Sequence, residues 1–165
     1  MNCNGSITAE ERGCACFLAG TRYLDRRDIT YILEYLHNSA GLNQSDMQNY
    51  FDATDLALAS SNKAIMRQAA QSYTQYINRQ FAMRDYLYFK ASKPELFKYL
   101  YMNGAFFSVV NLADKSHSNT VEVSYTGLTD YIFTLRFTTN MGNRNSEYGQ
   151  KLSSDRVELR CQYFF

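Results

Sequence analysis

The sequence lacks several features that mark common protein classes. Tryptophan is absent, and proline occurs only once among 165 residues. No apolar run reaches the roughly 18 residues that a membrane-spanning helix needs, so we expect no membrane contact. The first residues are polar and do not form the apolar region of a secretory signal peptide. These absences predict a chain that is synthesised in a reducing cytoplasm.

Motifs of known chemistry are missing as well. The sequence contains no P-loop, no G-x-G-x-x-G pattern and no G-x-S-x-G elbow. Its only imidazoles are His37 and His117, and we interpret His37 as a capping or surface residue in the last turn of a helix. Asp52 and Asp55 lack the Glu-x-x-His motif with which helical carboxylates bind metals. We therefore predict no catalytic residue, no enzymatic activity and no cofactor.

The four cysteines do not match a zinc site. Cys14 and Cys16 form a Cys-x-Cys pair, whereas zinc-binding pairs are usually separated by about two to four residues and are repeated elsewhere. Cys161 lies on the apolar side of an alternating segment, so we interpret it as a small core residue. We predict no metal ligands.

Charge and aromatic content point to protein contacts. The formal net charge is +1, which disfavours broad electrostatic binding to nucleic acid or to anionic lipid. The chain has 14 tyrosines and 11 phenylalanines. Tyrosine fills strand-rich cores and is also favoured where a surface meets another protein, so composition leaves both roles open.

After Gly104, apolar and polar residues alternate with a period of two, which is typical of strands with one buried face. In the final segment, Asp155–Phe165, every second residue from Val157 onward is apolar. Turn-forming residues separate the segments. The pattern predicts a four-stranded antiparallel meander over residues 105–112, 121–125, 131–139 and 155–165.

Before Gly104, the spacing of apolar residues predicts about four to five helices. Thr8 and Glu11 form a capping box for the first helix, and Gly20 is its expected C-cap. Two further capping boxes, Ser45–Gln48 and Ser92–Glu95, begin later helices. The polar triplet 60–62 favours two helices over one long helix in the middle of this region. The expected helices cover residues 8–20, 28–37, 46–91 and 92–103.

These patterns predict an α+β fold. Residues 1–104 would form a helical part and residues 105–165 an antiparallel β part, packed together in one compact domain. The amphipathic helices are the layer that we expect to cover the apolar face of the sheet.

The connection Asn140–Ser154 is long for a compact domain, in which most loops have about 4–6 residues. It offers few apolar side chains, so we predict an arm that contacts a neighbouring subunit and does not stabilise its own domain. Tyr148 would anchor it, and Arg144, Glu147 and Lys151 would add polar or ionic contacts. A solvated hairpin tip and a ligand-binding loop are the alternatives.

A small basic cluster gives the chain a second possible function. Arg22, Arg26 and Arg27 lie close together in the sequence and could contact phosphate groups. Asp25 and Asp28 flank them and would neutralise part of that charge. A nucleic-acid-binding regulator is therefore the alternative to an assembly role.

Helices followed by a meander with a long polar hairpin, in a chain rich in tyrosine and asparagine, resemble the small structural proteins of tailed bacteriophages. The most similar type is a head-to-tail connector, an adaptor or a tail-ring subunit. The resemblance implies a non-enzymatic component of the virion that is made in the host cytoplasm. It also implies a ring-shaped homo-oligomer that contacts other structural subunits of a larger assembly.

Overall fold

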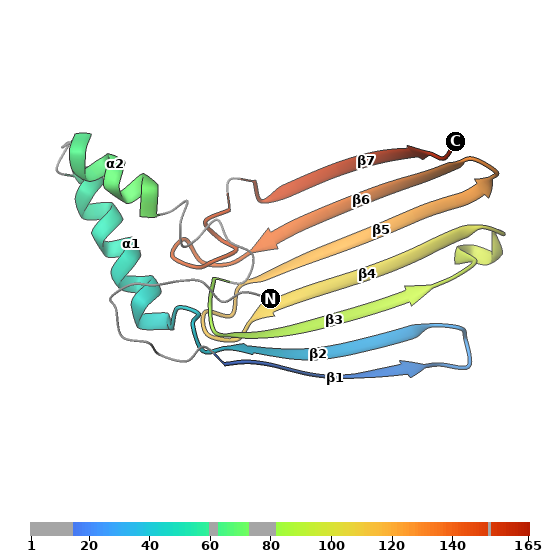
Figure 1. The fold of residues 1–165 in the computed structure, drawn as a ribbon, viewed down its shortest axis with the longest axis horizontal. Coiled ribbons are helices and arrows are strands. Elements are labelled where there is room, and N and C mark those ends of the chain that lie inside the picture. The colour runs from blue at the N-terminus through green and yellow to red at the C-terminus, as the bar shows by residue number, and fades with distance from the viewer. Residues whose placement is uncertain (1–14, 60–62, 73–81, 152) are drawn as a thin grey trace.

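A single antiparallel sheet dominates the computed structural model, which describes residues 15–59, 63–72, 82–151 and 153–165. Among these residues, seven strands follow one another in sequence order, and two helices are inserted between the second and third strands. Figure 1 shows both helices beyond one end of the strands and not over the middle of the sheet. The elements are β1 (Cys16–Leu24), β2 (Thr30–Asn38), α1 (Gln44–Ala59), α2 (Lys63–Ser72), β3 (Asp85–Lys93), β4 (Met102–Asn111), β5 (His117–Leu128), β6 (Tyr131–Met141) and β7 (Asp155–Tyr163).

The predicted α+β fold, with N-terminal helices followed by a four-stranded meander, is wrong. Residues 16–20 and 30–37, assigned above to helices, lie in the strands of the β1–β2 hairpin. Thr30, Tyr31 and Ile32 favour a strand because β-branched and aromatic side chains pack well on a pleated surface. Asp28 closes the turn with a φ of 60°, a left-handed conformation that aspartate tolerates. The beginning of the first expected helix lies outside the described residues.

The described residues in the middle of the chain include two helices, where two were expected. The triplet 60–62 between them and residues 73–81 lie outside the described residues. The predicted N-cap is wrong by two residues. Asn43, not Ser45, caps α1: its Oδ1 accepts a hydrogen bond from the Asp46 amide at 2.8 Å. Asp46 returns the contact by accepting from the Asn43 amide at 3.2 Å, which completes a capping box.

The last two expected helical segments are strand and turn. Residues 85–93 form β3, which pairs with both β2 and β4. The Ser92–Glu95 box does not begin a helix, because Glu95, Phe97 and Lys98 have φ values of 49°, 57° and 66°. This connection contains only a short 3₁₀ turn, Leu96–Lys98. The strands at 102–111, 117–128, 131–141 and 155–163 lie where the alternation predicts them.

The core is small and lies at the helical end of the sheet. Its buried residues are Met47 and Phe51 from α1, Met83, and Tyr86 from β3. Partly buried side chains from the sheet and from the β6–β7 loop pack against them: Leu36, Leu42, Tyr50, Val109, Ala113 and Tyr148. The helical layer therefore packs against one end of the sheet and does not extend over the length of a face.

We predict that Asn43→Ala lowers the free energy of unfolding by about 1 kcal/mol, because α1 loses its N-cap acceptor. The matched control is Ser45→Ala, which removes the hydroxyl of the cap expected from the sequence and should cost less than half as much. Urea denaturation of both variants measures the difference. Equal losses would show that Asn43 is not the dominant cap.

Candidate interaction surfaces and the buried loop anchor

One side of the sheet consists mostly of apolar side chains. A cross-strand row joins Phe106, Val121, Phe137 and Val157 from β4 to β7. Aromatic rings continue this side, with the centroids of Phe89 and Phe106 6.3 Å apart. We call this side the apolar face. The register also places on it Tyr23, Tyr31, Leu33, Tyr125, Tyr131, Phe133, Leu135, Leu159, Cys161 and Tyr163.

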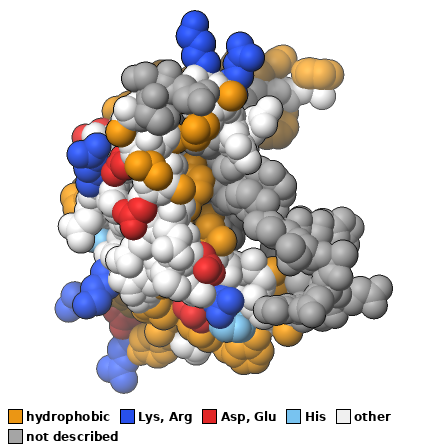
Figure 2. Space-filling view, turned by 90° about the vertical axis from the view of Figure 1, so that its left-hand side faces the viewer, with side chains coloured by type: hydrophobic (Ala, Val, Ile, Leu, Met, Phe, Trp, Pro, Cys, Tyr) orange, Lys and Arg blue, Asp and Glu red, His pale blue; other side chains and the backbone are white. Residues whose placement is uncertain are grey.

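The apolar face is the more exposed side of β6. Leu135 is 51% exposed and Phe137 44%, whereas Thr134, Arg136 and Thr138 on the opposite side are half-buried. A sheet that covers its apolar side would show the reverse pattern. Figure 2, a view from the end that bears the helices, shows hydrophobic side chains at the surface among the charged ones. Cys161 is exposed on this face, so its interpretation as a core residue is wrong.

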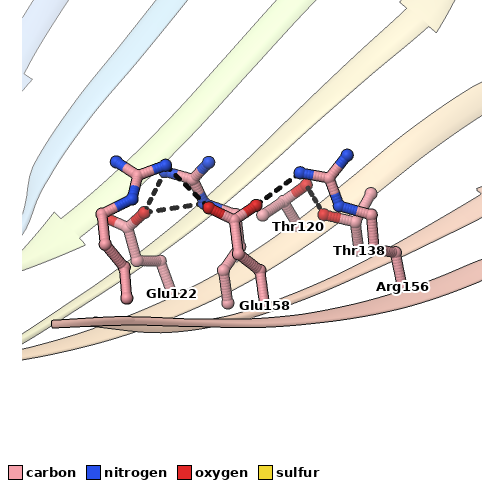
Figure 3. Close-up of polar contacts among 7 residues, drawn as sticks. Thr120, Glu122, Thr138, Arg156 and Glu158 are labelled. Atoms are coloured by element: carbon pink, nitrogen blue, oxygen red, sulfur yellow. Dashed lines mark hydrogen bonds and ion pairs between the residues drawn. The ribbon is translucent and has the colours of Figure 1, made fainter. Parts of the chain in front are cut away.

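The opposite side bears a ladder of alternating charges on β5, β6 and β7. Glu122, Arg136 and Glu158 are direct cross-strand neighbours in one row. The Arg136 Nε donates to Glu122 at 2.9 Å, and Glu158 accepts from Arg156 and, at 2.7 Å, from Arg160 (Figure 3). We call this set the charge ladder.

The charge ladder has a polar neighbour on the same side of the sheet and a carboxylate with a lowered pKa. Thr120 and Thr138, also in Figure 3, lie beside it with their hydroxyl oxygens 3.0 Å apart. The hydrogen bonds from Arg156 and then from Arg160 hold the pKa of Glu158 below its usual value. Glu158 is therefore ionised at neutral pH and contacts both arginines at this edge of the sheet.

The β6–β7 loop is fastened to its own domain by a buried carboxylate. Glu147 is 1% exposed. Its Oε2 accepts from the Tyr86 hydroxyl at 2.6 Å and from the Asn111 amide at 2.9 Å, and its Oε1 accepts from the Ala82 amide at 3.2 Å. The Tyr86 hydroxyl also accepts from the Met83 amide at 2.7 Å. Glu147 thus ties the loop to β3, to β4 and to the segment that precedes β3.

A second carboxylate holds the backbone of the same loop. Asp114, in the β4–β5 turn, accepts from the Glu147 amide at 2.7 Å and from the Ser116 hydroxyl at 2.6 Å. Ser116 is fully buried, and its Oγ accepts in turn from the Tyr148 amide at 3.3 Å. At Gly149, an added Cβ would lie 2.0 Å from the Asn143 carbonyl oxygen, so only glycine permits this close approach.

Burial controls the ionisation of this anchor. Desolvation raises the pKa of Glu147 above its usual value, although hydrogen bonds from Tyr86 and Ala82 oppose the rise. Desolvation, followed by the charge of Glu147, raises the pKa values of Tyr86 and Tyr148. Both tyrosines therefore remain protonated at physiological pH.

The four loop residues that were predicted to bind a partner differ in their exposure. Glu147 and Tyr148 pack against their own domain, and Arg144 is exposed. Lys151 is partly exposed. The expectation that this loop does not stabilise its own domain is wrong, because its carboxylate bonds to three separate elements of the fold. Contact of Arg144 or Lys151 with a partner stays a prediction.

The arginines of the alternative function lie far from the helical end. Arg22 is on β1, and Arg26 and Arg27 are exposed in the β1–β2 turn at the other end of the strands (Figure 1). Arg84 precedes β3 at the helical end, where its Nε donates to the Gly41 carbonyl at 2.9 Å. The three predicted arginines therefore lie in one hairpin, and Arg84 does not extend their cluster.

The two histidines are also kept apart. His37 lies in β2, so its predicted place in the last turn of a helix is wrong. Its Nδ1 is 2.7 Å from Asp85 Oδ1, which also accepts from the Tyr35 hydroxyl at 2.5 Å. The hydrogen bond from Tyr35, and then that from His37, lower the pKa of Asp85. His117 lies on β5, three strands away from β2 in the sheet.

The charge ladder and the Glu147 anchor were both missed in the sequence. The ladder has a signal there: Glu122, Arg136 and Glu158 alternate in sign at polar positions of neighbouring strands. Glu147 has none, because a glutamate in a glycine-flanked polar loop normally indicates a solvated residue. Its partners come from distant parts of the chain, and only the folded arrangement brings them together.

We predict that Glu147→Ala lowers the free energy of unfolding by about 2–4 kcal/mol, because buried donors of Tyr86 and Asn111 lose their acceptor. The matched control is Arg144→Ala in the exposed part of the same loop, which should change it by less than about 0.5 kcal/mol. Chemical denaturation measures both. Similar effects of the two substitutions would contradict the anchor.

The raised pKa of Glu147 predicts a pH dependence of stability. The folded state binds a proton at this site more tightly than the unfolded state, so stability is lost as pH rises from 4.5 through the folded pKa. The difference in unfolding free energy between wild type and Glu147→Gln should therefore favour wild type more at acid pH. Denaturation series between about pH 4.5 and pH 8 test this; a difference that does not change with pH would contradict it.

Within the described ranges, no group of three or more His, Cys, Asp or Glu residues could hold a metal ion. Neither α1 nor α2 is long and apolar enough to cross a membrane. Comparison of the chain with protein-family models, with curated proteins and with solved structures gave no match.

Proposed function

We propose that this chain is a non-enzymatic subunit of a larger protein assembly, in which other subunits cover its apolar face. The observation that supports this is the exposure pattern of β6, where Leu135 and Phe137 face solvent and the polar side is half-buried. Monomeric proteins rarely expose contiguous apolar patches larger than a few hundred Å².

The size of the apolar face suits a protein partner. Val157 and Leu159 are 69% and 75% exposed, and Tyr163 is 55% exposed. Together with the exposed apolar side chains of β4–β6, they present on the order of 1000 Å² of apolar surface, which reaches the range of a stable protein–protein interface. Tyrosine and phenylalanine, which dominate this face, are enriched in the cores of such interfaces.

A virion of a tailed bacteriophage is the assembly that the sequence resemblance suggests, and it remains part of this proposal. A structural subunit fits the two functional expectations that the sequence raises, namely an excess of tyrosine and no catalytic motif. The nucleic-acid alternative has less support, because Arg26 and Arg27 sit between Asp25 and Asp28 in one turn.

We expect purified wild-type protein to self-associate or to bind subunits of its assembly, and Leu135→Glu to abolish that association by placing a charge on the apolar face. Thr134→Glu is the matched control, since it adds the same charge to the other side of the same strand, next to Arg160. Light scattering gives the masses. Wild-type protein that stays monomeric and binds no co-produced subunit, or equal loss of association in both variants, would refute the proposal.

A further inference from the structure

The outer edge of β7 ends the sheet. β7 is the last strand in the order β1 to β7, so its side away from β6 pairs with no strand in the part of the chain that the structure describes. All nine of its residues are at least partly exposed, and the strand contains no proline. An edge of this kind is a template for pairing with another strand.

The charge ladder stops at this edge. Its row runs from Glu122 through Arg136 to Glu158 with alternating sign. Along β7 itself, the residues of this side are Arg156, Glu158, Arg160 and Gln162. A strand added beside β7 would extend the alternation if it placed a positive charge opposite Glu158.

We propose that β7 pairs antiparallel with β7 of a second copy of this chain, about a two-fold axis at Leu159. In this register, Glu158 of each copy lies opposite Arg160 of the other, and Arg156 lies opposite Gln162. The row then reads Glu122, Arg136, Glu158, Arg160 across the junction, with strictly alternating charge. The strand is thus complementary to itself.

Neighbouring registers that keep each face on its own side are less favourable. An axis at Glu158 would place Glu158 opposite Glu158 of the second copy, and an axis at Arg160 would place Arg160 opposite Arg160, so that like charges meet in both cases. An axis at Val157 would leave the C-terminal part of β7 unpaired. Only the axis at Leu159 pairs all nine residues of the strand and matches both charges.

The two-fold contact also preserves the apolar face. An axis perpendicular to the sheet keeps the apolar sides of both copies on the same side, and Val157 of one copy lies opposite Cys161 of the other. A ring contact between β7 and β1 would instead be parallel, because alternate strands of an antiparallel meander run the same way. This proposal rests on the proposed assembly role, and it specifies one contact between two subunits of that assembly.

Charge reversal tests the register. Arg160→Glu should weaken the dimer about tenfold or more. The new glutamate of each copy would lie opposite Glu158 of the other copy, so the substitution creates two like-charged pairs across the axis. Arg156→Glu is the matched control: both arginines bind Glu158 within the chain, but Arg156 would face the neutral Gln162, so its reversal should change the dissociation constant by less than about threefold. Sedimentation equilibrium measures both constants, and equal effects would overturn the register.

Cross-linking with native Cys161 gives a second test that does not depend on charge. Cys3, Cys14 and Cys16 are first replaced by serine, so that Cys161 is the one native thiol left. With copper–phenanthroline as oxidant, Val157→Cys in this background should give disulfide-linked dimers, and Asp155→Cys, which meets Cys161 only with the axis at Glu158, should not. Adding Cys161→Ser to Val157→Cys should abolish the link. Val157 is 69% exposed, so this substitution should not prevent folding.

The outcomes separate this proposal from the assembly role. Efficient linking through Asp155→Cys, persistence of the link without Cys161, or no link in either variant would overturn the β7 dimer. If wild-type protein still associates through the apolar face in that case, the assembly role stands without it. A wild-type chain that never associates would overturn both.

Discussion

The rest of this structure depends on one constraint: a wide sheet has an apolar side to bury, and the described part of the chain has only two α-helices with which to cover it. Seven strands present two faces, while the two described helices lie beyond one end of the strands. The core that they form with the sheet centres on Met47, Phe51, Met83 and Tyr86. The core side chains of the sheet, such as Tyr86 and Val109, lie on the side that bears the charge ladder. The apolar face on the other side has no covering layer among the described residues, and the hydrophobic effect therefore favours association with other proteins.

A polar anchor stabilises the end of the sheet where the core is formed. Glu147 links the β6–β7 loop to Tyr86 and Asn111, and Asp114 holds the backbone of the same loop. Each buried polar side-chain atom among the described residues has a hydrogen-bond partner, as a stable buried network requires. Because the core and the anchor lie on the other side of the sheet, the apolar face and the β7 edge stay exposed.

The sequence allowed prediction of the four C-terminal strands, because their apolar and polar residues alternate with a clear period of two. It misled at Ile29, Ile32 and Leu33, where a helical spacing occurs inside a segment whose side chains favour a strand. The Glu147 anchor could not be predicted, because its partners are 36, 61 and 65 residues away in the sequence. The missing cover of the apolar face is likewise a property of the whole arrangement, since amphipathic helices in a sequence do not reveal where they pack.

Hydroxyl-radical footprinting of the assembled and the diluted wild-type protein tests the central claim most directly, because it reports the solvent exposure of individual aromatic side chains. The account predicts that Phe133 and Phe137 on the apolar face are protected in the assembly and become reactive on dilution to the monomer. Exposed Tyr99, in the β3–β4 connection, provides an internal reference. Equal reactivity of Phe133 and Phe137 in both samples would contradict the claim that other subunits cover this face.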